Sequence, residues 1–174
     1  MKPLFIVLLL AATAFAQDAT RLAPACGPNG ASFDVVTTKN PHKAATPDAG
    51  KALVYFIEDD TRFDTVPKPT VRAGLDGAWA GATHGNSFFA VSVDPGEHHL
   101  CASWQTYGLV FRAGTRSAAA QLTAEAGHSY YFRIKNVFRK DESPILADFE
   151  LIDSDEGQLL ANSYSLSLFD PKKK

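Results

Sequence analysis

Histidine and cysteine side chains gather near the middle of the chain, and they are the residue types best suited to chemistry. His98, His99 and Cys101 lie close together, and Cys26 and His84 are candidates for the same site. On an extended strand His99 and Cys101 share a face, because successive side chains alternate. Thiolate and imidazole ligands suit zinc or copper. A metal-binding protein or metal-dependent enzyme using His84, His98 and His99 is therefore one hypothesis.

The two cysteines have a second interpretation, a disulfide bond. Two thiols in a small domain usually pair in an oxidising compartment, and the signal-like first 16 residues predict export to such a compartment. Leu100, Ala102 and Trp104 form the apolar face of their strand, so Cys101 lies on the opposite face. We predict that a Cys26–Cys101 bridge holds an N-terminal arm across the outer face of a sheet. The bridge and the metal site are alternatives, because the metal site requires both thiolates.

Strong catalytic signatures are absent from the sequence. It contains no G-x-S-x-G, no H-E-x-x-H and no glycine-rich phosphate-binding motif. Asp59 and Asp60 could join the histidines in a metal-dependent hydrolase, but carboxylates in a polar loop are more often solvated. We assign no catalytic residue, metal or cofactor, and we expect a protein that is not an enzyme.

Four aromatic residues are candidate contacts for a partner, which we expect to be an envelope protein or a glycan. Trp79 follows a tight turn and is expected to be exposed, and Tyr131 lies on the outward stripe of its strand. Tyr107 and Phe111 lie in a longer connection. A solvated sheet face is the alternative for the stripe. Residues 107–117 also suggest a third hypothesis, a secreted inhibitor that inserts this loop into a partner.

The elements that must position these residues are short strands between glycine, proline and aspartate turns. Residues 52–57 are apolar on both faces, which favours a central strand, and Asp76-Gly77 is typical of a two-residue hairpin turn. Residues 153–156 provide an N-cap and acidic first turn for a short helix over 158–162. The pattern predicts an all-β fold, an antiparallel β-sandwich of about eight strands, immunoglobulin-like or transthyretin-like, with one short C-terminal helix.

The first 16 residues have the layout of a secretory signal peptide. A lysine precedes an apolar run, and alanines follow at both positions of an A-x-A exit, so cleavage is expected near Ala16-Gln17. Residues 17–50 then form an arm with one strand at 33–38, residues 51–170 a sandwich domain, and residues 171–174 a basic tail. Export to the periplasm or the medium follows from this layout. No later stretch is apolar and long enough to span a bilayer.

The length and charge of the chain narrow the classes of protein further. A chain of 174 residues suits one domain, and its 45% hydrophobic content is too high for disorder. The net charge of −2 argues against a nucleic-acid binder, which needs a basic surface to neutralise phosphates. We therefore expect a non-enzymatic exported domain, with a binding or structural role in the bacterial envelope or periplasm.

The order of the turn motifs resembles a known family. Residues 71–81 (VRAGLDGAWAG) and 93–100 (VDPGEHHL) resemble the D-G and P-G-E-H hairpin pattern of PEGA-like modules. With residues 51–56 before them and 126–132 after them, they resemble the uncharacterised exported family called domain of unknown function 2846. The resemblance covers residues 50–152. It implies a β-sandwich in secreted or lipoprotein-like envelope proteins and transfers no catalytic residue. Unlike the lipoprotein members, this chain has no cysteine directly after its apolar run.

Overall fold

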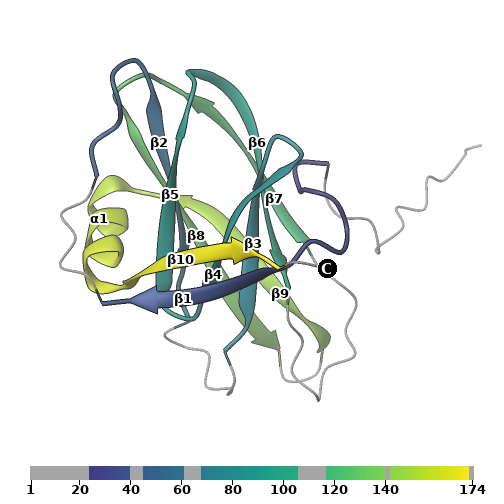
Figure 1. Cartoon of the computed structure of the whole chain (residues 1–174). Helices are drawn as coiled ribbons and strands as arrows, with labels where there is room; N and C mark the ends of the chain where they lie inside the picture. Colours follow the sequence, from purple (N-terminus) through teal and green to yellow (C-terminus); the bar gives the residue numbers. More distant parts are fainter. Residues whose placement is uncertain (1–23, 40–44, 61–67, 106–116, 140–141, 173–174) are drawn as a thin grey trace, which may run out of the picture.

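The structure is a computed structural model that describes residues 24–39, 45–60, 68–105, 117–139 and 142–172, with the backbone alone at 136–139 and 142–147. Within these residues the chain forms ten strands and one helix (Figure 1). They are β1 (Phe33–Thr38), β2 (Ala52–Glu58), β3 (Thr70–Leu75), β4 (Ala78–His84), β5 (Ser87–Val93), β6 (Gly96–Trp104), β7 (Ser117–Ala124), β8 (Ser129–Arg139), β9 (Glu142–Ile152), α1 (Ser154–Ser163) and β10 (Ser165–Pro171). No helix among the described residues is long and apolar enough to cross a membrane.

The strands form two sheets. One has six strands in the order β1-β10-β5-β2-β8-β9, and the other has four in the order β4-β3-β6-β7. The predicted all-β, sandwich-like architecture is confirmed, but the expectation of a wholly antiparallel arrangement is wrong. β2 runs parallel to β8, and β10 runs parallel to β5. Between β2 and β8 the chain builds all four strands of the other sheet, and such a long crossover permits parallel pairing.

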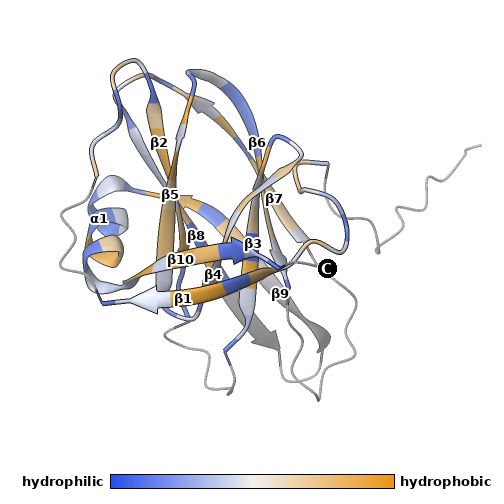
Figure 2. Cartoon of the chain, viewed as in Figure 1, coloured by the Kyte–Doolittle hydropathy of each residue, from blue (hydrophilic) through white to orange (hydrophobic). Residues whose placement is uncertain are grey.

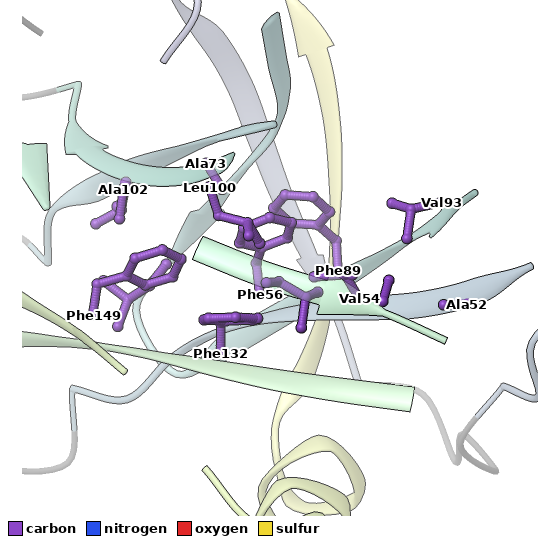
Figure 3. Packing of buried hydrophobic residues seen from close by; sticks show 14 of the residues in the cluster. Ala52, Val54, Phe56, Ala73, Phe89, Val93, Leu100, Ala102, Phe132 and Phe149 are labelled. Atoms are coloured by element: carbon purple, nitrogen blue, oxygen red, sulfur yellow. The ribbon is translucent and has the colours of Figure 1, made fainter. Parts of the chain in front are cut away.

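The main core lies between the two sheets and is rich in phenylalanine (Figure 3). The ring centroids of Phe56 and Phe89 are 5.2 Å apart, as are those of Phe132 and Phe149. Leu100 and other small and aliphatic residues of the four-stranded sheet pack against these rings. Aromatic pairs of this kind add about 0.5–1.5 kcal/mol each beyond the burial of their area.

β2 is buried on both faces, as its sequence predicted. Its outer face is buried because the helix lies over it. Its outward side chains, including Tyr55 and Ile57, join a second apolar cluster that contains Ala161 of α1. α1 therefore covers the side of the six-stranded sheet away from the four-stranded sheet (Figure 1). Hydrophobic residues, orange in Figure 2, are prominent along β2 and β5.

The C-terminal segment differs most from expectation. β10 was not predicted, and it pairs with β1 along all six residues of that strand, from Phe33↔Pro171 to Thr38↔Leu166. The strand expected at 33–38 is present as β1, and it forms the edge of the six-stranded sheet. Lys172 is also held, because its amide donates to Ser32 O and its ammonium lies 3.1 Å from Asp34. The basic tail is thus ordered through Lys172.

Candidate binding sites

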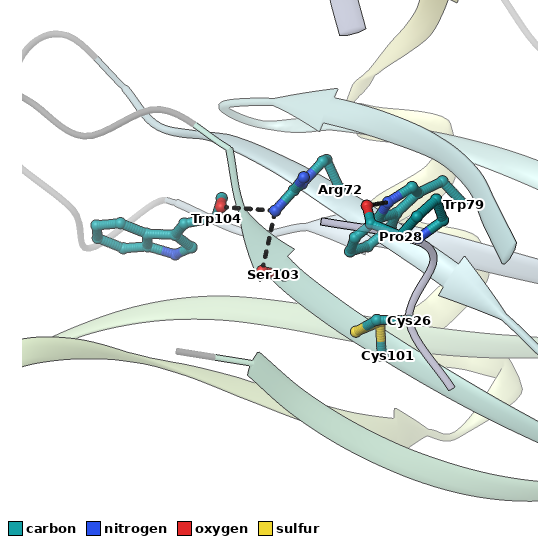
Figure 4. Close-up of a disulfide and its surroundings, with 7 residues drawn as sticks. All are labelled: Cys26, Pro28, Arg72, Trp79, Cys101, Ser103 and Trp104. Carbon is teal, nitrogen blue, oxygen red and sulfur yellow. Dashed lines mark hydrogen bonds between the residues drawn. A yellow bond between two sulfur atoms is a disulfide. The ribbon is translucent and has the colours of Figure 1, made fainter. Parts of the chain in front are cut away.

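The Cys26–Cys101 bridge is present, as predicted (Figure 4). Its Cα atoms are 5.4 Å apart, and both cysteines are buried on the outer face of the four-stranded sheet. Gly74 on neighbouring β3 makes room for it, because a Cβ there would lie 2.9 Å from Cys101 Sγ and 3.0 Å from Ala25 O. The bridge therefore seats the arm directly on the sheet, and the two thiols are not available as metal ligands.

Trp79 lies between the arm and the sheet instead of projecting into solvent. Its indole N–H donates to Pro28 O over 2.9 Å, and a Cβ added at Gly27 would overlap its ring. The guanidinium carbon of Arg72 is 4.3 Å from the ring centroid, a cation–π arrangement. Trp79 is half-buried rather than fully exposed, because the arm that follows Cys26 covers part of the hairpin (Figure 4).

Arg72, on β3, anchors the arm from the side of the sheet. It is 6% exposed, and it donates to Ala31 O of the arm at 2.5 Å and toward Ser103 Oγ and Trp104 O at 3.4 Å. Burying a guanidinium is costly unless it is hydrogen-bonded. Its hydrogen bonds connect the arm, β3 and β6. The sequence motifs did not single out Arg72. Its position in a strand of alternating apolar residues was the one feature that could have indicated a structural role.

A pocket of about 500 Å³ lies beside the bridge. We call it the bridge-side pocket, and it is lined by Pro24, Ala25, Asp76, Gly77, His99, Ala119 and Ala120. Its walls come from the arm, the β3–β4 turn, β6 and β7. The turn has the predicted form, since Asp76 and Gly77 have φ values of 50° and 83°. Small side chains and turn backbone thus form a largely apolar recess with an imidazole at its rim.

His98 connects two turns at this end of the sandwich. Its Nδ1 lies 2.7 Å from Asp76 Oδ2, and its Nε2 lies 2.7 Å from Asp94 O. Because both ring nitrogens face acceptors, both act as donors in the protonated ring. Burial opposes that charge, but the hydrogen bonds to Asp76 and Asp94 outweigh it and raise the pKa of His98. The pKa of Asp76 is lowered, because its bonds from His98 and the His99 amide outweigh its burial.

The three histidines of the metal hypothesis do not form one site. His84 pairs with Thr70 at the start of β3, whereas the amide of Asp76, just beyond the end of β3, donates to His99 O. A six-residue strand therefore separates His84 from His98 and His99, about 17 Å at the usual rise per residue. Within the described part of the chain, no group of three or more His, Cys, Asp or Glu residues could hold a metal ion.

The carboxylates near the end of β2 are engaged in structural contacts. Asp60 is 2% exposed, and its amide donates to Asn86 Oδ1 over 2.8 Å. Tyr164, at the end of α1, donates its hydroxyl to Asp59 Oδ1 over 2.8 Å. These contacts hold the end of β2 against the β4–β5 turn and the helix, rather than presenting a pair of free carboxylates.

Tyr131 is 3% exposed, so it does not project into solvent as its outward position in the strand suggested. Its ring stacks on Tyr55 at 4.6 Å between centroids, and α1 lies over it. Gly157 permits this approach, because a Cβ at that position would overlap the Tyr131 ring. The outward side of β8 is a sheet face, and the helix covers it at Tyr131. The predicted N-cap is confirmed: Asp153 accepts from the amides of Asp155 and Glu156.

A second pocket, also of about 500 Å³, borders Tyr131. We call it the helix-side pocket. It lies between α1, the β7–β8 turn with the start of β8, and the segment before β2. Its lining residues are Ala45, Thr46, Pro47, Gly127, His128, Ser129, Tyr131, Ser154, Gln158 and Asn162. Of the four aromatic candidates, Tyr131 thus lines a pocket, whereas Tyr107, Phe111 and nearly all of the 107–117 loop lie outside the described residues.

Comparison with known proteins finds one family model. The model is described as protein of unknown function, DUF2846, and it matches residues 48–144. No curated protein and no solved structure matches the chain. The matched region runs from the segment before β2 to the beginning of β9, so it includes the whole four-stranded sheet and both turns joined by His98. Because this region is more than half of the chain, the protein belongs to the DUF2846 family.

Proposed function

We propose that this protein is an exported, non-enzymatic domain of the bacterial envelope or periplasm with a binding or structural role. The proposal includes removal of residues 1–16 near Ala16-Gln17 and an immunoglobulin-like or transthyretin-like type of sandwich. The observation that carries it is the buried Cys26–Cys101 bridge. A structural bridge of this kind is maintained in oxidising compartments, which agrees with the signal-like start of the chain.

The same bridge supports a binding role. It works with Trp79 and Arg72 to hold residues 24–31 on the sheet, so the bridge-side pocket has walls that are already in place. A rigid recess loses little conformational freedom when a ligand enters it, and affinity benefits from that preorganisation. The histidines and carboxylates nearby join turns to one another, which is a structural use of these side chains.

Cell fractionation combined with thiol labelling tests the export part. In a bacterial host, we expect the full chain to reach the periplasm in a shortened form that has no reactive thiol before reduction. A version that lacks residues 1–16 should remain in the cytoplasm with two reactive thiols. A full-length chain that stays in the cytoplasm with both thiols free would overturn the proposal.

Site-specific crosslinking in the native cell tests the binding part. A photo-crosslinking amino acid in place of Ala119 lies in the bridge-side pocket, whereas one at Thr123 lies on the same strand outside it. We expect a discrete adduct from position 119, weak or no adduct from 123, and loss of the first when both cysteines are replaced. Equal yields at the two positions would refute this pocket as the contact site.

A further inference from the structure

We infer that the helix-side pocket is a binding site for a neutral saccharide unit. The inference rests on the proposed function, an exported binding domain, and it specifies the ligand of a second pocket. About 500 Å³ lies within the range of small-molecule sites. Three separate segments of the chain converge on it, so the recess is a product of the tertiary structure rather than of one loop.

The helix contributes a polar stripe to this pocket. Ser154, Gln158 and Asn162 recur every four residues on α1, which places them on one helical face. All three are exposed, whereas Gly157 and Ala161 carry the buried face of the helix. The stripe supplies two amides and a hydroxyl, groups that both donate and accept hydrogen bonds.

The opposite walls are held in position by the sheet. The Tyr55 hydroxyl donates to Ala45 O over 3.1 Å, which ties the segment carrying Thr46 to β2. On the other side, the amide of Leu53 donates to His128 O, and that of Gly127 donates to Lys51 O, so the β7–β8 turn is also held by β2. Such fixed walls are what a site requires to orient a polar ligand.

The chemistry of the lining selects for an uncharged, hydroxyl-rich ligand. Among the described residues that line the pocket, none carries a carboxylate, an ammonium or a guanidinium group, and the imidazole of His128 has its Nδ1 3.8 Å from Glu125 Oε2. A cationic ligand would find no counter-charge there, and an anionic ligand would have to compete with Glu125 for the imidazole. An apolar ligand would leave the hydroxyls of Thr46 and Ser129 and the amides of the helix without partners. A sugar presents hydroxyls to such groups, and its C–H face suits the small apolar surface at Ala45 and Pro47.

The sheet topology disfavours an extended peptide in the same place. Peptides commonly bind by adding a strand to a free sheet edge. β8, which forms the floor beside Tyr131, is paired with β2 on one side and with β9 on the other. Recognition there must therefore use side chains, as sugar recognition does, rather than a ladder of backbone hydrogen bonds.

Titration of the exported, oxidised protein with N,N′-diacetylchitobiose, followed by ¹H–¹⁵N NMR, tests the inference. We expect saturable shifts at the side-chain amides of Gln158 and Asn162 and at backbone amides 127–129. Gln158→Leu and Thr46→Ala should each weaken binding roughly 3- to 10-fold, the effect of one lost hydrogen bond. Leu159→Gln, on an exposed part of the same helix, should leave the affinity unchanged.

Two further arms of the experiment separate the sources of sugar and the competing ligands. Co-sedimentation with purified bacterial sacculi would identify a wall polymer, and binding of free chitobiose alone would identify a soluble saccharide; either result supports the site. Shifts produced by a blocked alanine tripeptide or by digalacturonate but not by chitobiose would overturn it. So would shifts elsewhere on the protein, or unchanged binding in both pocket variants.

Failure of this inference is distinguishable from failure of the proposed function. Fractionation and thiol labelling report on export and oxidation without any sugar. If those results hold and chitobiose does not bind, only the saccharide assignment is refuted. Because the Thr46→Ala change lies outside the helix, it remains informative even if Gln158→Leu weakens the helical structure.

Discussion

Replacing Cys26 and Cys101 together by alanine removes the crosslink between the arm and the sheet. The bridge closes a sequence separation of 75 residues. With that length, the chain-entropy expression gives about 15 cal/mol/K, or about 4.5 kcal/mol at 25 °C, through greater freedom of the unfolded chain. Losing the buried Cys101 sulfur adds a packing cost of about 1 kcal/mol. We expect the free energy of unfolding to fall by about 5 kcal/mol.

Urea unfolding measured by tryptophan fluorescence checks this value. For a urea dependence of about 2 kcal/mol/M, the midpoint should fall by about 2.5 M. The slope of the unfolding free energy against urea concentration should also become steeper, because an unfolded chain without the crosslink exposes more surface. The folded state should persist, since β1 remains paired with β10 along its whole length and Arg72 still contacts the arm.

Reduced wild-type protein is the matched control, because it loses the crosslink and retains both sulfur atoms. Its midpoint should lie between those of the oxidised protein and the alanine variant, closer to the variant. If reduction moves the midpoint by less than about 0.5 M, the bridge does not constrain the unfolded chain as calculated. In that case the entropic reasoning is refuted, whatever the alanine variant shows.

Substitutions at three other positions test the packing and electrostatic arguments. Gly157→Ala should destabilise the protein by about 1–3 kcal/mol in thermal unfolding, because the added Cβ would overlap Tyr131. Alanine normally stabilises an exposed helix relative to glycine, so an increase in stability would contradict this packing argument. Since the pKa of His98 is raised above 6.5, its stabilising contribution is fully present below that value and is lost as the pH rises through the folded-state pKa. The difference in unfolding free energy between wild type and His98→Gln, measured in urea, should therefore shrink from pH 5.5 to 8.5. Asp76 stays ionised over this range. A constant difference would show that the charge on His98 does not stabilise the fold. Trp79→Ala should cost about 2 kcal/mol and speed proteolysis of residues 24–32, whereas Trp79→Phe should retain most of the protection.

Local patterns were sufficient for much of the fold. The hairpin at Asp76-Gly77 was predictable because its two left-handed residues are a local requirement. The inward positions of Leu100 and Trp104 followed from alternation along a single strand, and so did the outer-face position of Cys101. Once Cys101 was placed on that face, an oxidising compartment made pairing with Cys26 the expected outcome.

The errors share a different cause. Tyr131 was placed on an outward face by alternation, and Trp79 was expected to be exposed because it follows a tight turn, but neither local pattern reveals what lies over such a residue. The arm covers Trp79 and α1 covers Tyr131, and both covering segments are distant in sequence. Similarly, β10 is a short segment whose partner β1 lies more than a hundred residues earlier, so no local turn indicated the pair.

The sequence by itself determined the all-β character, the hairpin, the helix cap, the apolar faces of the strands and the family, because each depends on neighbouring residues or on the order of short motifs. Only the tertiary structure decided which outward faces are covered, which strands run parallel, how far His84 lies from His98, and where the two pockets form. Those features depend on contacts between segments far apart along the chain, and their free energy comes from surfaces that no single segment contains. The His98, Cys26 and Cys101 side chains that first suggested catalytic chemistry thus join turns and hold an arm, and the proposed sugar site lies beside the helix.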